Sequence, residues 1–302
     1  MKDILESSYS LKIIGIIKIK ENIYKIKTDD QLYVVKIVKD THIEQVYEYI
    51  QTMHVHCFVD ILLNKNNEVL TRYNEQYLYV MPYLDNSQGK LQDIKIKMYF
   101  ETLAYLHEKT FYQIKVNQEY YEMIEKDILK VIEERCSYYE QMITHYENTM
   151  YRSPSQWLLM MNYHRIYHSL NRARDYLQKY RELCANHFQI RVCLTYRNFD
   201  YDHICLKQKA LLSIEDVCID LPIYDLFYMY QKIPDVLFDL DCCSQYYFCR
   251  ITLKEEEKAL LCCLMSIVPI VKFGKDEIDN IIKLSRLLYY LDSIYCFIES
   301  CH

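Results

Sequence analysis

The stretch LKIIGIIKIKENIYKIKTDDQLYVVKIV, residues 11–38, carries the strongest structural signal in the chain. Its branched and aromatic residues alternate with lysines in three short runs, which is the pattern of strands that bury one face. Polar residues suited to tight turns separate the runs, at Glu21-Asn22 and at Thr28-Asp29-Asp30. The sequence therefore predicts three antiparallel strands joined by hairpins.

The residues that follow extend this sheet. A short helix is expected over residues 42–53, and the stretches FVDILLN (58–64) and QYLYVMPYL (76–84) predict two further strands, the last ending at Pro82. A polar stretch comes next, and we expect a hinge at about residues 82–89. The first predicted lobe, residues 1–84, is thus a small five-stranded antiparallel sheet with one helix.

Beyond the hinge the sequence becomes helical in character. Apolar residues recur at the three-and-four spacing of buried helix faces, and a β-rich segment over 189–219 interrupts them. The predicted helices cover residues 91–108, 119–149, 155–185, 224–232, 253–271 and 276–299. We therefore predict an α+β chain whose second lobe, residues 85–302, is mainly helical.

Composition and charge exclude several classes of protein. The 302 residues are 51% apolar and 26% charged, which is typical of a globular chain with a large core and not of a disordered one. The three glycines stand far apart, so the sequence has no glycine-rich phosphate-binding loop. The longest apolar run, residues 259–271, is too short to span a bilayer. A net charge of −6 with scattered basic residues argues against nucleic acid as the main partner.

Cysteines and histidines form no convincing metal motif. The thirteen cysteines include no CxxC pair, and the adjacent Cys262 and Cys263 would point about 100° apart on a helix, so we expect buried thiols and no metal. His164 and His168 have the four-residue spacing of helical metal ligands. Their neighbours suit a surface, and packing is the preferred interpretation. His54 and His56 are also expected to be structural.

Four motifs carry a resemblance to known proteins. They are YVVKIVK (33–39), TLAYLHEKT (102–110), LTYRNFDYDHICL (194–206) and LLSIEDVCIDLPIYDLF (211–227). Together with the order of a β-rich lobe, a hinge and a helical lobe, they resemble the protein-kinase-like superfamily, in its branch of aminoglycoside phosphotransferases and choline kinases. Within that branch the chain resembles the spore coat kinase-like proteins of spore-forming Firmicutes, the CotS, YutH and YsxE type, and most of all the YsxE-like members.

The resemblance implies a remnant of a nucleotide site. Lys36 would stand where such enzymes keep the lysine that pairs with nucleotide phosphates and with a carboxylate of the next helix. Either Glu44 or Glu48 could supply that carboxylate, and a Lys36–glutamate pair is expected to hold the first lobe together without ligand. Glu215 would keep a carboxylate in the metal motif.

The positions that would carry the chemistry depart from the active pattern. The base that receives the hydroxyl proton becomes Asn198, and an amide cannot accept that proton. One magnesium ligand becomes His203, which prefers softer metals, and the other becomes Ser213. Asp200 or Asp202 could replace the base if the alignment is shifted. The same two residues, with Glu215 and Asp216, are then the alternative metal ligands.

These departures imply a catalytically defective kinase-like protein, with no catalytic residue, metal or cofactor. The resemblance places its synthesis in the cytoplasm of the mother cell and its assembly on the spore coat, with other coat proteins as partners. The 32 tyrosines could supply contacts or cross-links there, or could reflect only coding bias. The alternative is an active phosphotransferase that uses ATP and magnesium on a small alcohol, of the aminoglycoside, choline or homoserine kinase type. Between them lies a protein that holds a small-molecule ligand without turnover.

Overall fold

The computed structural model describes residues 1–84, 92–231 and 240–300. The chain forms two compact units. One consists of Met1–Thr110 with Asn198–Cys218, and the other of Phe111–Arg197 with Ile219–His302. The expected hinge at 82–89 falls largely on residues 85–91, outside the described residues, and the lobe boundary after residue 84 stays a prediction.

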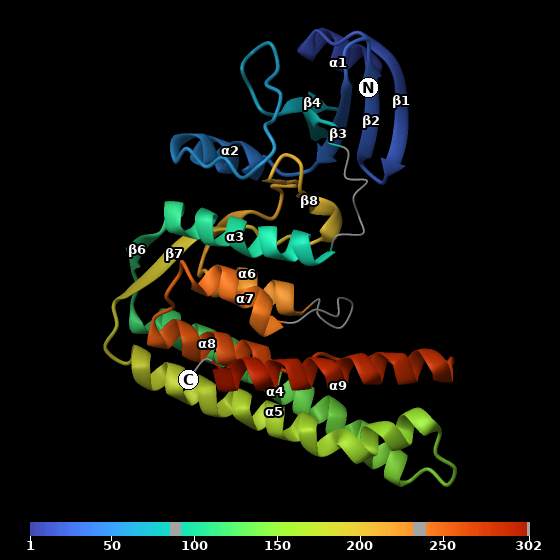
Figure 1. Ribbon diagram of the computed structural model, residues 1–302, viewed down its shortest axis with the longest axis vertical. Helices are drawn as coiled ribbons and strands as arrows, with labels where there is room; N and C mark the ends of the chain where they lie inside the picture. The colour runs from blue at the N-terminus through green and yellow to red at the C-terminus, as the bar shows by residue number, and fades with distance from the viewer. Residues whose placement is uncertain (85–91, 232–239, 301–302) are drawn as a thin grey trace. The chain divides into compact units, whose positions relative to one another are not determined.

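The first unit is built on a five-stranded antiparallel sheet (Figure 1). Its strand order is β1-β2-β3-β5-β4. The strands are β1 (Ile13–Lys20), β2 (Ile23–Thr28), β3 (Leu32–Val38), β4 (Thr71–Tyr73) and β5 (Gln76–Pro82). Asn22 has φ 62° in the first hairpin turn, a left-handed conformation that asparagine tolerates. The predicted α+β fold with a small antiparallel sheet and a mainly helical remainder is confirmed.

One predicted strand is wrong. Residues 58–64 form only isolated bridges, from Phe58 to Leu211 and from Leu62 to Val80, and the short β4 is the fifth strand instead. Phe58 is nevertheless buried. An irregular segment can bury apolar side chains as fully as a strand does, so hydrophobicity alone did not separate the two cases.

Two helices accompany the sheet. α1 (Lys2–Tyr9), which the sequence reading missed, adds Leu5 and Tyr9 to a core cluster that also contains Val35 of β3. α2 (His42–Thr52) appears where it was predicted, with Ile43, Val46 and Ile50 as its buried face. Leu5 and Tyr9 of α1 therefore belong to the same core cluster as β3, the strand that contains Lys36.

The segment 198–218 is anchored within the first unit. It contains the 3-10 helix η1 (Tyr201–His203) and the strands β8 (Ile204–Cys205) and β9 (Ala210–Leu211). Lys95 of α3 (Gln92–Thr110), which is 1% exposed, donates a hydrogen bond of 2.7 Å to the carbonyl of Tyr201. The backbone of Leu211 also donates to the carbonyl of Cys57 at 2.8 Å. These contacts hold the predicted catalytic loop and metal motif.

The second unit is mainly helical. A three-stranded sheet of β6 (Tyr112–Lys115), β7 (Gln189–Thr195) and β10 (Cys218–Asp220) has the order β10-β7-β6. The long α5 packs against α4, α8 and α9, as Figure 1 shows. The helices are α4 (Gln118–Glu147), α5 (Pro154–Cys184), α6 (Ile223–Tyr230), α7 (Leu240–Phe248), α8 (Glu255–Ser266) and α9 (Glu277–Ser300). The bounds of α4, α5, α6 and α9 agree with the predicted helices to within two residues, whereas α8 ends at Ser266, five residues before the predicted end. The predicted β segment 189–219 contains β7 and most of β10, and α7 and β6 were not predicted.

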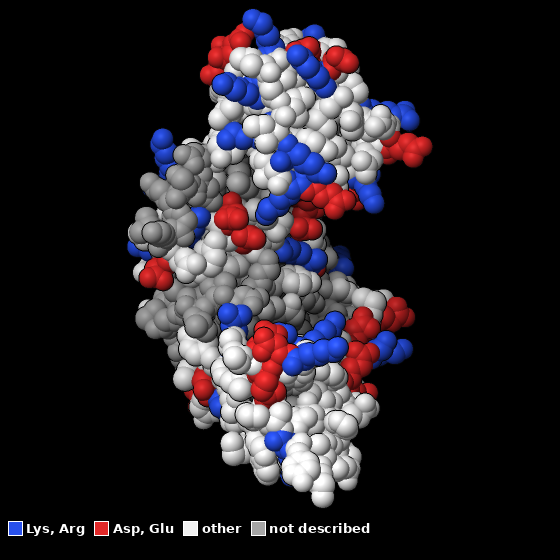
Figure 2. Space-filling view, turned by 90° about the vertical axis from the view of Figure 1, so that its right-hand side faces the viewer, with Lys and Arg blue, Asp and Glu red and all other residues white. Residues whose placement is uncertain are grey.

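Two further features of the structure are its surface charge and its cysteines. On the face shown in Figure 2, basic and acidic side chains are interspersed. Of ten cysteines whose exposure is known, six are buried, and none of these ten forms a disulfide bond. Within the described ranges, no helix combines the length and the apolar character that crossing a membrane requires.

Candidate functional site

Lys36 is tied to the predicted metal motif. It lies in the middle of β3, between Ile23 of β2 and Tyr79 of β5 in the sheet register. Its side chain is 11% exposed, and its ammonium group donates to Glu215 Oε1 at 2.7 Å and to the hydroxyl of Ser213. All of these residues belong to the first unit.

Glu215 is the centre of this cluster. Its Oε1 also accepts a hydrogen bond of 2.6 Å from the hydroxyl of Tyr79, a residue that the sequence reading did not single out. Burial raises the pKa of Glu215, but the charge of Lys36 and the hydrogen bonds from Lys36 and Tyr79 outweigh it and hold the pKa below its ordinary value. The carboxylate is therefore ionised at neutral pH. Its second oxygen, Oε2, is buried and has no hydrogen-bond partner among the described residues.

The predicted pairing of Lys36 with Glu44 or Glu48 is wrong. α2 buries Ile43, whereas both glutamates are exposed. At 100° per residue, Glu44 and Glu48 point well away from the buried face of this helix. The carboxylate partner of Lys36 therefore comes from residue 215, far along the chain.

His203 lies beside the same cluster. Burial lowers the pKa of its imidazole, and the charge of Lys36 lowers it further, while a hydrogen bond to the Asn198 carbonyl and nearby carboxylates oppose the shift. The contact joins His203 Nδ1 to the Asn198 oxygen at 3.2 Å. Since a carbonyl only accepts, Nδ1 carries the proton and Nε2 is the acceptor of the neutral ring. The contact involves the Asn198 backbone, not its amide side chain.

Two residues of the predicted motifs have a left-handed backbone conformation. Arg197 has φ 58° and Ser213 has φ 68°, both in the left-handed region that costs a residue with a side chain roughly 1–3 kcal/mol. Position 197 is where the active pattern has glycine, which adopts such angles freely. Strain of this kind is usual at functional sites and persists only where neighbouring contacts enforce it.

Asp225, which was not predicted as a site residue, supports the backbone of the predicted catalytic loop. The fully buried Asp225 of α6 accepts hydrogen bonds from the backbone N–H groups of Tyr196 at 2.8 Å and Arg197 at 2.6 Å. The signal was available, because Asp225 is the one charged residue in the apolar run IYDLFYMY (223–230).

The alternative carboxylates do not gather around Glu215. Asp200, Asp202 and Asp216 are all exposed, and Asp200 caps η1 by accepting from the Asp202 N–H. No group of three or more histidine, cysteine or acidic residues suited to a metal occurs in the part of the chain that the structure describes.

Both histidine pairs are exposed at the surface of their units. His164 and His168 are exposed on α5, with ring centroids 6.5 Å apart. They therefore lie at a surface and not in a packed core. His54 and His56 are exposed as well.

The described residues do not fit a magnesium nucleotide. Magnesium requires near-octahedral oxygen ligands. Here Glu215 Oε1 is already bound by Lys36 and Tyr79, Ser213 accepts from Lys36, and position 203 offers an imidazole. The ammonium group of Lys36 therefore already neutralises the carboxylate that a metal ion would use.

Comparison with solved structures shows the same fold in small-molecule phosphotransferases. An aminoglycoside phosphotransferase from Alicyclobacillus acidocaldarius has a TM-score of 0.71 at 12% identity, over 99% of this chain and 96% of that one. Spectinomycin phosphotransferase in complex with ADP and spectinomycin has a TM-score of 0.56 at 11% identity, over 97% and 96%. A microcompartment-associated aminopropanol kinase has a TM-score of 0.53 at 10% identity, over 99% and 94%. Identities this low establish the fold alone.

Sequence comparisons add nothing to this result. No family model matches the sequence, and no curated protein matches it significantly.

Proposed function

We propose that this chain is a pseudokinase, a protein with the phosphotransferase fold that does not transfer phosphoryl groups. The observation that carries the proposal is the Lys36–Glu215 ion pair of 2.7 Å. The lysine expected to hold phosphates neutralises the carboxylate expected to hold metal, so each charge already has its partner without ligand. A magnesium nucleotide would have to break this pair before it could bind.

The remaining positions favour the same function. Phosphoryl transfer depends on positioning and on neutralisation of charge by metal ions and cationic side chains. Asn198 has an amide side chain where an active enzyme has a base. Its backbone carbonyl accepts a hydrogen bond from His203. Ser213 has a single hydroxyl oxygen, which receives a hydrogen bond from Lys36.

Thermal unfolding with ATP, with and without magnesium, tests this proposal. A ligand present at 100 times its Kd stabilises a fold by about 2.7 kcal/mol, which shifts the melting temperature measurably. We expect magnesium to add no stabilisation beyond that of ATP alone, and we expect no magnesium-dependent turnover of ATP. Turnover would establish the active phosphotransferase instead.

A second candidate is metal-free binding of a small ligand that donates a hydrogen bond. The buried Oε2 of Glu215 favours it, because this acceptor has no partner among the described residues. Stabilisation by a nucleoside or amino sugar without magnesium, abolished by Glu215→Gln, would identify this function.

We further propose that the protein acts as a structural or scaffolding component of the spore coat and binds other coat proteins. The support is the motif resemblance together with several exposed tyrosines, including Tyr151 at 86% and Tyr295 at 50%. A fluorescent fusion in sporulating cells tests it. The expected signal appears in the mother cell and then surrounds the forespore, and a signal that stays diffuse contradicts the proposal.

A further inference from the structure

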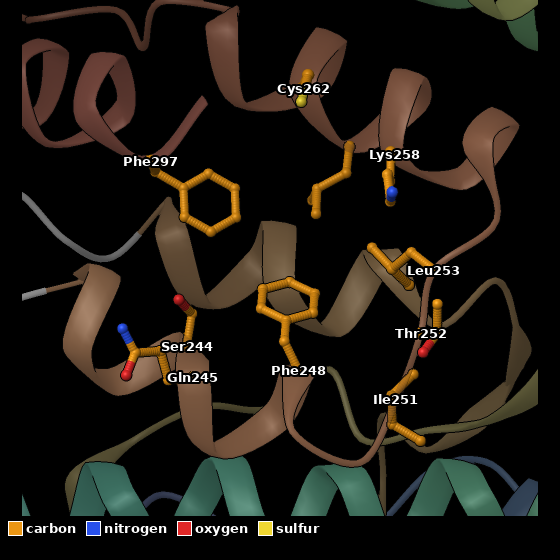
Figure 3. Close-up of a pocket in the computed structure, with 10 residues that line it drawn as sticks. Ser244, Gln245, Phe248, Ile251, Thr252, Leu253, Lys258, Cys262 and Phe297 are labelled. Atoms are coloured by element: carbon orange, nitrogen blue, oxygen red, sulfur yellow. The ribbon is translucent and has the colours of Figure 1, made fainter. Parts of the chain in front are cut away.

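The second unit contains a cavity of about 350 Å³ lined by α7, α8, α9 and the residues between α7 and α8 (Figure 3). Its deepest lining is apolar. Ile251, Leu253, Leu261 and Phe297 are each at most 5% exposed. The ring of Phe248 lies on the other side, with its centroid 6.1 Å from that of Phe297.

Polar side chains are confined to a few positions of the lining. Ser244 is 3% exposed, Gln245 and Thr252 are exposed, and Lys258 is partly buried. Their amide, hydroxyl and ammonium groups can all donate hydrogen bonds. Among the described residues that line the cavity, none is acidic.

The charge of Lys258 remains accessible to a ligand. Its ammonium group pairs with Glu255 at 2.8 Å, but this is an i,i+3 pair on one helix and the Glu255 side chain is 63% exposed. Exposed pairs of this kind are weak because solvent screens them. An anionic group in the cavity mouth can therefore share or replace Glu255 as the partner of Lys258.

Such a cavity is larger than a packing defect. Protein interiors contain few voids larger than a water molecule, whereas pockets for small molecules begin at about 300 Å³. A pocket of this size can enclose most of an aliphatic chain of medium length, such as that of decanoate.

We propose that this cavity binds a medium-chain carboxylate, with the aliphatic tail against Leu261 and Phe297 and the carboxylate beside Lys258. The apolar floor recognises the tail by burial, and the donors at the mouth recognise the oxygens. The site lies wholly within the second unit, so it is independent of the Lys36–Glu215 cluster.

Calorimetric titration with hexanoate, octanoate, decanoate, dodecanoate and tetradecanoate tests the proposal. Each added methylene should tighten binding about fourfold, equivalent to roughly 0.8 kcal/mol, until the cavity is full. Because the pocket is finite, this gain should stop within the series, before tetradecanoate. An affinity that keeps rising to tetradecanoate, or no binding of decanoate, overturns the proposal.

Variants locate the site. Gln245→Trp, at an exposed position of the mouth, should block decanoate without disturbing the fold, and Cys262→Met should fill the cavity where Cys262→Ala leaves it open. Lys258→Met keeps the apolar stem and should weaken decanoate at least tenfold while leaving decanol unchanged. Circular dichroism checks the folding of each variant. Unchanged decanoate binding by folded Gln245→Trp and Cys262→Met proteins contradicts the proposal.

Discussion

Replacement of Lys36 by methionine removes the cation from the cluster and keeps most of the apolar stem. Glu215 then loses its ion pair but stays largely buried, with a hydrogen bond from Tyr79 remaining on Oε1. Removing one partner of a fully buried pair costs about 3–5 kcal/mol. Because the Glu215 side chain is 25% exposed, solvent screening reduces the expected loss to about 2 kcal/mol. For a unit of this size, that loss lowers the melting temperature by about 4–8 °C.

A double-mutant cycle with Glu215→Gln separates the pair from general damage. If the two side chains stabilise the fold through each other, the double variant should be more stable than the sum of the single losses predicts, by about 1–2 kcal/mol. Lys39→Met, at an exposed position three residues away, is the matched control and should be nearly neutral. Denaturant unfolding followed by circular dichroism measures the wild type, the two single variants, the double variant and the control. Additive losses, within about 0.5 kcal/mol, would refute the ion pair as the organising contact of this site.

Three further predictions concern pH, metal and the loop backbone. Glu215 and His203 both have folded pKa values below their ordinary values of 4.5 and 6.5, so the folded state binds their protons more weakly than the unfolded state. Stability should therefore fall as pH drops through 6.5 and fall again below 4.5, and His203→Gln should remove the first decline in a series of melting curves. The triple change Asn198→Asp, His203→Asn and Ser213→Asp should raise the affinity for magnesium in calorimetry. It should yield no ATP turnover, because Lys36 remains ion-paired with Glu215. An unchanged magnesium affinity would mean that the motifs are misaligned. Asp225→Asn should cost about 1–3 kcal/mol in unfolding experiments, since the amide nitrogen cannot accept from a backbone N–H; a neutral result would contradict its role as a support of the loop.

Local patterns predicted the elements of the fold well. The alternation of residues 11–38 specified three strands, and the three-and-four spacing specified α4 and α5, because each pattern reports which side of an element is buried. β4 is only three residues long, too short to show a period. α1 lies in a stretch of mixed polarity, and its burial depends on a sheet formed later in the chain.

The site was predicted only in part. The resemblance of the motifs to known kinases singled out Lys36, His203, Ser213 and Glu215. All four lie in the first unit of the structure. The partner of Lys36 could not be read from the sequence, because it lies 179 residues away and the choice depends on which face α2 buries. That face was visible in the spacing of apolar residues in α2, and it argued against both Glu44 and Glu48. Nothing in the sequence marked Tyr79 as a site residue. Its role follows from its position opposite Lys36 on the neighbouring strand.

The first unit is discontinuous in the chain, since residues 198–218 complete a body that begins with residues 1–110. A ribosome adds about 5–20 residues per second, so roughly 5–20 s separate the synthesis of residue 110 from that of residue 218. During that interval Lys36 has neither Glu215 nor Ser213, and the backbone of Cys57 lacks the strand residue Leu211. The nascent first unit therefore stays incomplete while residues 111–197 emerge. A ribosome-bound fragment that stops at residue 197 should be cleaved by protease in the sheet, and one that extends through residue 218 into an unstructured tether should be protected there.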